Sequence, residues 1–176
     1  MWKRIVIPLL ILLLPATPTH ADEFRIGLGI FNFAGGPDFQ MSYRPKQSHW
    51  QIGYRHNHWV DTFESPFTGR DLTENSTTMT GPFVCYLFNI ESRKTYYLGV
   101  SMLQWSITEK SLRTGESDTD SVTVPFFGGG YTGRLGKSGY FNLGAFLSSA
   151  ELKVETSVSG TETTGADLQL QLGIIF

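Results

Sequence analysis

The polar stretch over residues 55–71 holds the side chains with the clearest potential for chemistry. His56 and His58 are separated by one residue, so on a β-strand both imidazoles project from the same face. Asp61 and Ser65 follow within a few residues. A histidine beside a carboxylate can act as a general base or bind a metal ion. His56, His58, Asp61 and Ser65 are therefore the candidate catalytic residues.

The strand that would carry these histidines also favours a different interpretation. His56 and His58 share the parity of Ile52 and Tyr54, which are apolar. That parity predicts that both imidazoles face outward at the rim of a sheet, without a catalytic role. We predict no metal site and no cofactor from the sequence.

A second candidate site lies on the opposite face of the strands, where Trp59, Tyr97 and Trp105 have interior parity near several glycines. Large aromatic side chains beside glycines could line a pocket for an acyl chain. The alternative is an interior polar network, because buried charges need partners. Asp167 shares interior parity but is predicted near the other end of its strand. The side chains that would form this network are Arg25, Arg44, Arg55, Gln51, Gln169 and Gln171.

Alternating apolar and polar residues bounded by turn signals run through the chain and position these side chains. The pattern predicts an all-β, eight-stranded, antiparallel up-and-down β-barrel. A run of glycines, Gly128-Gly129-Gly130, predicts a bulge or bend in the sixth strand. The expected strands are residues 24–33, 39–44, 50–60, 76–88, 96–107, 121–133, 140–150 and 168–176.

The expected connections alternate in length and in charge. Short turns follow the second, fourth and sixth strands, and they carry five basic residues against one acidic residue. Polar loops are expected over residues 61–75, 109–120 and 151–164, where eleven acidic residues face four basic ones. Acidic loops could meet lipopolysaccharide phosphates through bridging divalent cations.

The first 21 residues have the features of a secretory signal peptide. Lys3 and Arg4 precede an apolar core that is too short to span a bilayer, and Ala21 is the expected last residue before cleavage. We therefore divide the chain into residues 1–21, a cleavable signal peptide, and residues 22–176, a single barrel domain. The formal charge of −2 gives no reason to expect nucleic acid as a partner.

The last nine residues alternate up to a terminal aromatic residue, with Ile175 as the one misfit. This stretch resembles the closing strand of Gram-negative outer-membrane β-barrels, a superfamily whose pattern ends in phenylalanine. The resemblance implies a transmembrane β-barrel in the bacterial outer membrane, reached through the secretory pathway, among lipid and lipopolysaccharide. It also implies recognition by the barrel-assembly machinery through Leu168, Leu170, Leu172, Ile174 and Phe176.

Three functions remain open at this stage. The first is a non-catalytic structural or surface-binding barrel with acidic external loops, so the protein is not expected to be an enzyme. The second is a lipid A-modifying acyl hydrolase or acyltransferase, because outer-membrane barrels that edit lipid A use a rim histidine with serine or aspartate. The third is a small barrel that binds a lipid or other hydrophobic ligand at Trp59, Tyr97 and Trp105.

Overall fold

The computed structural model describes residues 22–32, 37–64, 72–155 and 160–176. The predicted signal peptide and Ser65 lie outside these residues. No described helix has the length and apolar character needed to cross a bilayer.

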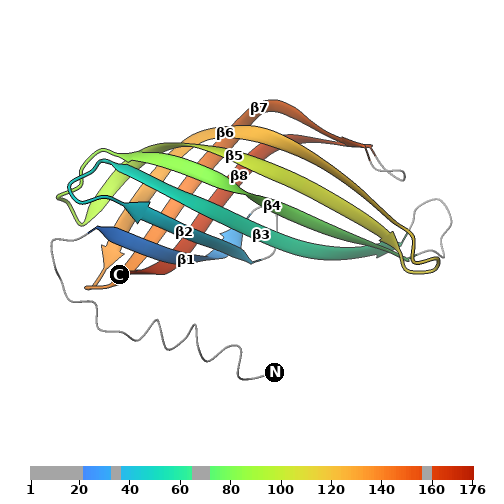
Figure 1. The fold of residues 1–176 in the computed structure, drawn as a ribbon, viewed down its shortest axis with the longest axis horizontal. Helices are drawn as coiled ribbons and strands as arrows, with labels where there is room; N and C mark the ends of the chain where they lie inside the picture. Colours follow the sequence, from blue (N-terminus) through green and yellow to red (C-terminus); the bar gives the residue numbers. More distant parts are fainter. Residues whose placement is uncertain (1–21, 33–36, 65–71, 156–159) are drawn as a thin grey trace, which may run out of the picture.

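Eight antiparallel strands make up the described part of the chain and close into one barrel (Figure 1). Each strand pairs with its neighbours in sequence, and the first also pairs with the last, with Leu28 beside Leu172. The predicted fold class and the predicted closing contact are confirmed. The strands are β1 Glu23–Asn32, β2 Asp38–Arg44, β3 Trp50–Glu64, β4 Leu72–Leu87, β5 Lys94–Ser111, β6 Ser117–Leu135, β7 Gly139–Glu155 and β8 Gly160–Ile175.

The two ends of the barrel differ. At one end, here called the turn end, residues 45–49, 88–93 and 136–138 connect the strands, and both the start of β1 and the end of β8 lie there (Figure 1). At the opposite end, here called the hairpin end, β3 to β8 extend far beyond β1 and β2. The wall of the barrel is therefore low at β1 and β2 and high elsewhere.

The predicted long polar loops are wrong over most of their length. β5 and β6 continue to Ser111 and from Ser117, so five residues connect them, and 61–64, 72–75, 151–155 and 160–164 also lie in strands. These segments lack alternating apolar residues, which made them resemble loops. They are rich in threonine and serine, which favour strands and bond across them. Thr108 Oγ1 lies 2.9 Å from Thr119 Oγ1 on the paired strand.

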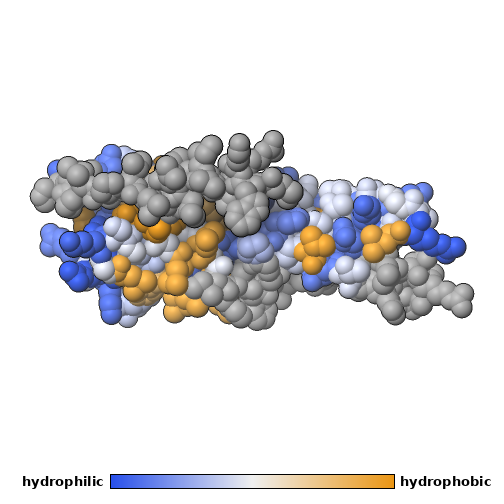
Figure 2. Space-filling view, turned by 90° about the horizontal axis from the view of Figure 1, so that it is seen from below, coloured by the Kyte–Doolittle hydropathy of each residue, from blue (hydrophilic) through white to orange (hydrophobic). Residues whose placement is uncertain are grey.

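An apolar belt lies on the outer face near the turn end. Figure 2 shows hydrophobic residues gathered over this half of one face, with mostly hydrophilic residues over the hairpin half. Outward parity predicted from the alternation is confirmed on β1, β2, β3, β5, β7 and β8, whereas the sequence left the parity of the sixth strand open. Exposed belt residues include Phe24, Leu28, Met41, Ile52, Tyr54, Leu98, Val100, Met102, Phe127, Leu143, Leu147, Leu168, Leu170 and Leu172.

Aromatic rings cluster on the outer face where this belt meets the turn end. Trp50 and Tyr86 lie edge to face with centroids 5.1 Å apart, and Tyr96, Tyr131 and Phe141 form a chain of contacts with centroids 5.0 and 5.7 Å apart. Aromatic residues prefer the boundary between lipid tails and head groups. The belt therefore has the border that membrane-spanning barrels show.

Hydroxyl-bearing residues replace the belt towards the hairpin end. Across β3 to β6, one outward row is His56, Thr80, Gln104 and Thr123, and the next is His58, Thr78, Ser106 and Ser121. These rows begin directly beyond Tyr54 and Met102. The outer surface thus changes from apolar to polar within the strands and not at their ends.

The interior divides into an apolar half and a polar half. β4 to β7 supply the apolar core cluster of Met79, Phe83, Cys85, Leu87, Tyr97, Leu103, Val124, Phe126 and Phe146. β1, β2, β3 and β8 supply most of the buried polar side chains. Charges therefore gather against one side of the lumen, with apolar packing opposite.

Glycines in β6 and β7 make room for this packing. The bulge predicted as one possibility at Gly128 to Gly130 is absent, because β6 keeps a regular register with β5 and β7 there. A Cβ added at Gly144 would lie 2.3 Å from the Tyr97 hydroxyl, and one at Gly130 would lie 2.6 Å from it. The glycines let a large ring enter a narrow interior.

Candidate functional site

The centre of the polar half is an ion cluster around Arg55. Its Nε donates to Asp38 Oδ1 at 2.8 Å, and its Nη2 donates to Asp167 Oδ1 at 3.1 Å, while Nη1 also contacts Asp167. All three side chains are buried. One guanidinium therefore joins β3 to β2 and to β8 across the lumen.

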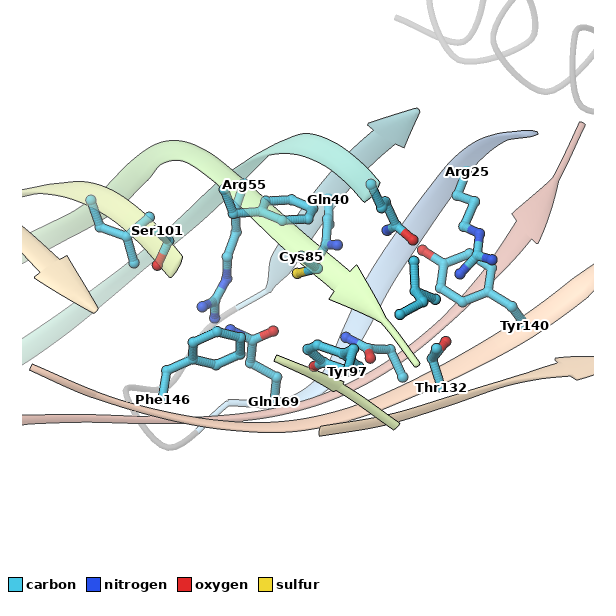
Figure 3. A pocket seen from close by; sticks show the side chains of 15 residues that line it. Arg25, Gln40, Arg55, Cys85, Tyr97, Ser101, Thr132, Tyr140, Phe146 and Gln169 are labelled. Atoms are coloured by element: carbon cyan, nitrogen blue, oxygen red, sulfur yellow. The ribbon is translucent and has the colours of Figure 1, made fainter. Parts of the chain in front are cut away.

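Two amide side chains donate further hydrogen bonds to the carboxylates of Asp38 and Asp167. Gln171 Nε2 donates to Asp38 Oδ2 at 2.8 Å, and Gln169 Nε2 donates to Asp167 Oδ2 at 2.6 Å. Two of the three glutamines predicted to join an interior network therefore do so here, while Gln51 Nε2 donates to Ser42 Oγ at 2.9 Å. Figure 3 shows Arg55 and Gln169 facing the same cavity from opposite walls.

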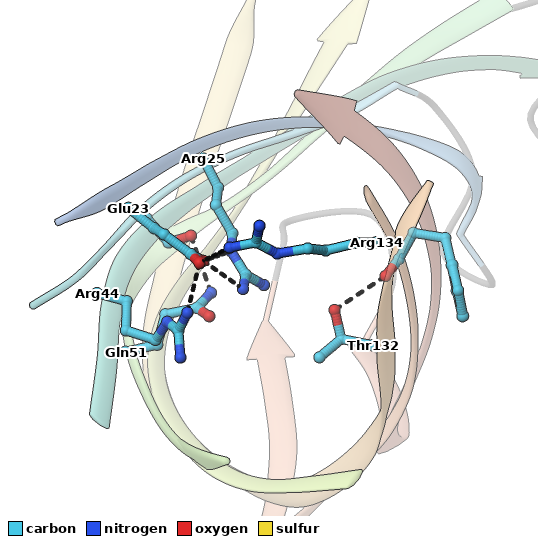
Figure 4. A network of polar contacts seen from close by, with 8 residues as sticks. Glu23, Arg25, Arg44, Gln51, Thr132 and Arg134 are labelled. Atoms are coloured by element: carbon cyan, nitrogen blue, oxygen red, sulfur yellow. Dashed lines mark hydrogen bonds and ion pairs between the residues drawn. The ribbon is translucent and has the colours of Figure 1, made fainter. Parts of the chain in front are cut away.

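A second ion cluster lies in the interior at the turn end (Figure 4). The carboxylate of Glu23 accepts from Arg25 Nη2 at 2.8 Å and from Arg44 Nη2 at 2.5 Å, and it also contacts the guanidinium of Arg134. Arg25 lies over the ring of Tyr140, with its Cζ 5.5 Å from the centroid. One carboxylate thus faces three guanidinium groups.

The cavity between these clusters is small. Its volume is about 30 Å³, which leaves room for about two water molecules. Tyr97 lines it together with Arg55, Cys85 and Phe146 (Figure 3). An acyl chain needs far more space than this cavity offers.

Trp59 and Trp105 do not line the cavity that Tyr97 lines. Their rings meet edge to face at 6.2 Å and pack against the apolar core cluster, and neither ring lines the cavity. The three predicted ligand-binding residues therefore do not line one cavity. Trp59 and Trp105 pack against each other, and Tyr97 lines a cavity that has room for about two water molecules.

The three candidate catalytic residues within the described part of the chain are not gathered on one face either. His56 and His58 are exposed on the outer face, and His58 Nδ1 lies 3.0 Å from Thr78 Oγ1. Asp61 is exposed with the opposite parity on β3, and Ser65 lies outside the described residues. Within the described part of the chain, no group of three or more histidine, cysteine or acidic side chains could hold a metal ion.

At the mouth of the turn end, Asp22 ties the start of β1 to the β2–β3 connection. Its carboxylate accepts from the Tyr43 hydroxyl at 2.7 Å and from the Lys46 amide at 2.9 Å. These hydrogen bonds, the Tyr43 bond foremost, hold the pKa of Asp22 below its ordinary value. These two hydrogen bonds hold Asp22, the residue just before β1, against the end of β2 and the β2–β3 connection.

Sequence reasoning missed the acids that pair with the interior arginines. Asp38 was predicted in a turn and Glu23 before the first strand, yet both share the parity of inward neighbours, Gln40 and Arg25 respectively. Asp167 was predicted to face the interior but near the other end of its strand, whereas the structure pairs it with Arg55. Extending the inward parity by one residue at each strand start would have found the first two.

Comparison of the fold with solved structures finds similar barrels. The N-terminal β-barrel domain of OprF from Pseudomonas aeruginosa has a TM-score of 0.57 and 12% identity, covering 90% of this chain and 98% of that chain. Neisserial surface protein A has a TM-score of 0.58 and 11% identity, covering 88% and 94%. Ail of Yersinia pestis, in complex with the heparin analogue sucrose octasulfate, has a TM-score of 0.53 and 12% identity, covering 89% and 94%.

These neighbours are small outer-membrane β-barrels, so the predicted resemblance to that fold is confirmed. At these identities the similarity extends to the fold alone. No protein-family model matches the sequence. No curated protein matches it either.

Proposed function

We propose that the protein is a non-catalytic barrel of the bacterial outer membrane that presents a polar sheet beyond the lipid. The observation that carries the proposal is the apolar belt, which covers the outer face near the turn end and has an aromatic border there. A water-soluble barrel would place such residues inside, because exposing a large apolar area to water is costly. Lipid contact removes that cost, and closure leaves no unpaired strand edge.

The hairpin end supports a surface role. β3 to β6 rise beyond the belt with rows of threonine, serine and histidine on their outer face. Hydroxyl-rich sheets suit contact with sugars and head groups, which offer matching donors and acceptors. Lipopolysaccharide is therefore the proposed neighbour of this wall, and the turn end would face the periplasm.

The interior supports a closed barrel more than a channel or a lipid carrier. Its polar half is joined by ion pairs and amides, and the cavity between the two ion clusters holds about two waters. A transport or carrier function would require these clusters to separate. A lipid A-modifying enzyme is the remaining alternative, and it rests on His56 and His58 alone.

Membrane separation tests the proposal. The full chain, expressed in a Gram-negative host, is expected in the outer-membrane fraction, with a gel mobility that changes on heating. Deleting Phe176 is expected to reduce the assembled form if the closing strand is read by the assembly machinery, whereas Phe176→Tyr keeps an aromatic end as the control. Recovery in the soluble fraction, or heat-insensitive migration, contradicts the proposal.

A further inference from the structure

The turn end of the lumen holds more positive charge than its partners neutralise. Arg25, Arg44 and Arg134 share the single carboxylate of Glu23 (Figure 4). Arg93, on the connection between β4 and β5, is exposed and makes no ion pair with any described residue. Four guanidinium groups therefore lie at this end of the lumen, and among the described residues Glu23 is the carboxylate that pairs with them, which favours a further anion nearby.

A cavity lies among these arginines. Its volume is about 20 Å³, which fits about one water-sized group, such as one oxygen of a larger anion. The four arginines line it, together with Ser92 and Thr132 among others, and the lining includes no carboxylate. An anion that entered there would meet four guanidinium groups and no carboxylate in the cavity lining.

Two buried donors at this cavity lack partners. Arg44 donates to Glu23 through Nη2, but its Nε is buried with no acceptor. The hydroxyl of Tyr140, which also lines the cavity, is likewise buried with no partner. Buried donors without acceptors are rare because each one costs stability. An anion at the cavity would supply an acceptor for Arg44 Nε.

We propose that this arginine-lined cavity binds a phosphate group, supplied by inorganic phosphate or by the head group of an anionic lipid. Guanidinium groups pair with phosphate through two parallel hydrogen bonds, and a tetrahedral anion can serve several arginines at once. Glu23 then acts as the fixed counter-charge that holds three arginines in place while Arg93 remains available. That the cavity opens to the periplasm rests on the proposed function, whereas phosphate binding does not.

Phosphorus NMR on the purified full chain tests the site. In zwitterionic detergent, titration with inorganic phosphate is expected to shift and broaden the phosphate resonance in a saturable way. Arg93→Gln removes an exposed arginine outside the ion pairs, so the barrel should still fold, and Arg44→Gln removes the unpaired Nε. Loss of one charged hydrogen-bond donor is expected to weaken binding by about tenfold or more. Lys137→Gln, at the same end but outside the cavity, is the control for net charge.

A second arm separates the two sources of phosphate. In nanodiscs of phosphatidylcholine with a minor fraction of phosphatidic acid, the lipid phosphate resonance is followed without free phosphate. Binding in either arm that is weakened by Arg93→Gln and Arg44→Gln, and unchanged by Lys137→Gln, supports the site and names its source. No saturable binding in both arms, or equal weakening by Lys137→Gln, overturns the proposal. Neither result depends on where the protein resides in the cell.

Discussion

Arg55 and Asp167 are 112 residues apart in sequence and form an ion pair inside the barrel. Arg55 comes from β3 and Asp167 from β8, so their contact crosses the lumen and not a shared strand boundary. Both side chains are at most 3% exposed. The pair, with Asp38, therefore links the neighbouring strands β2 and β3 to β8 across the lumen.

Removing the guanidinium should destabilise the barrel strongly. Arg55→Met leaves two buried carboxylates without a cationic partner, and such a loss costs about 3–5 kcal/mol. Urea titration of the protein folded in lipid vesicles, followed by heat-modifiable gel migration, measures the change. Lys137→Met, which truncates an exposed cation in a turn, should leave the unfolding free energy nearly unchanged.

The same position offers a rescue. Asp38→Asn and Asp167→Asn, added to Arg55→Met, remove the uncompensated charges and keep hydrogen-bonding side chains beside Gln171 and Gln169. The triple variant should recover most of the lost stability, because uncharged replacements for a buried ion cluster are often neutral. If the triple variant is as unstable as Arg55→Met, the charge argument for this cluster is wrong.

A side chain at Gly144 should lower the free energy of unfolding as long as Tyr97 keeps its hydroxyl. A Cβ at Gly144 would lie 2.3 Å from that hydroxyl, and the next neighbouring atom is 3.2 Å away. Gly144→Ala should therefore cost about 1–3 kcal/mol through overpacking. In a Tyr97→Phe background the same substitution should cost clearly less, and a double-mutant cycle in urea measures the difference. Equal costs in both backgrounds would show that the hydroxyl does not limit the space.

A charged side chain should destabilise the folded barrel when it replaces a residue of the apolar belt, but hardly when it replaces a residue of the outward polar rows. Leu98 and Gln104 both face outward on β5, but Leu98 lies within the belt and Gln104 in the first polar row. Leu98→Arg should lower the free energy of unfolding from phospholipid vesicles by about 2–4 kcal/mol, and Gln104→Arg should lower it by about 0–1 kcal/mol. Similar costs at both positions would place the lipid boundary elsewhere.

The strand parity could be predicted because alternation is a local property of an extended chain. It correctly set Leu98 and Leu170 outward and Arg55 and Gln171 inward. The ends of the strands could not be predicted in the same way, because beyond the belt both faces carry polar residues and Thr108 resembles a loop residue. Long-range pairs such as Arg55 and Asp167 depend on the register of all the strands between them, which no single segment encodes.

The two rim histidines should be dispensable for lipid A chemistry. Both imidazoles face outward, and Asp61 has the opposite parity on the same strand. His56→Ala with His58→Ala should therefore leave the lipid A mass spectrum of expressing cells identical to that of cells with the unaltered protein. As exposed substitutions, they should also change stability by less than about 0.5 kcal/mol each. A protein-dependent lipid A species that disappears in the double variant would establish the enzymatic alternative.

Cysteine accessibility on intact cells tests the central claim most directly. In a Cys85→Ser background, Ser117→Cys places a thiol at the hairpin end and Ser138→Cys places one in the connection between β6 and β7; both positions are exposed. An outer-membrane barrel in the proposed orientation predicts that a membrane-impermeant maleimide labels Ser117→Cys on intact cells and Ser138→Cys only after the outer membrane is opened. Equal labelling of both positions on intact cells, or labelling of neither until full lysis, would contradict it.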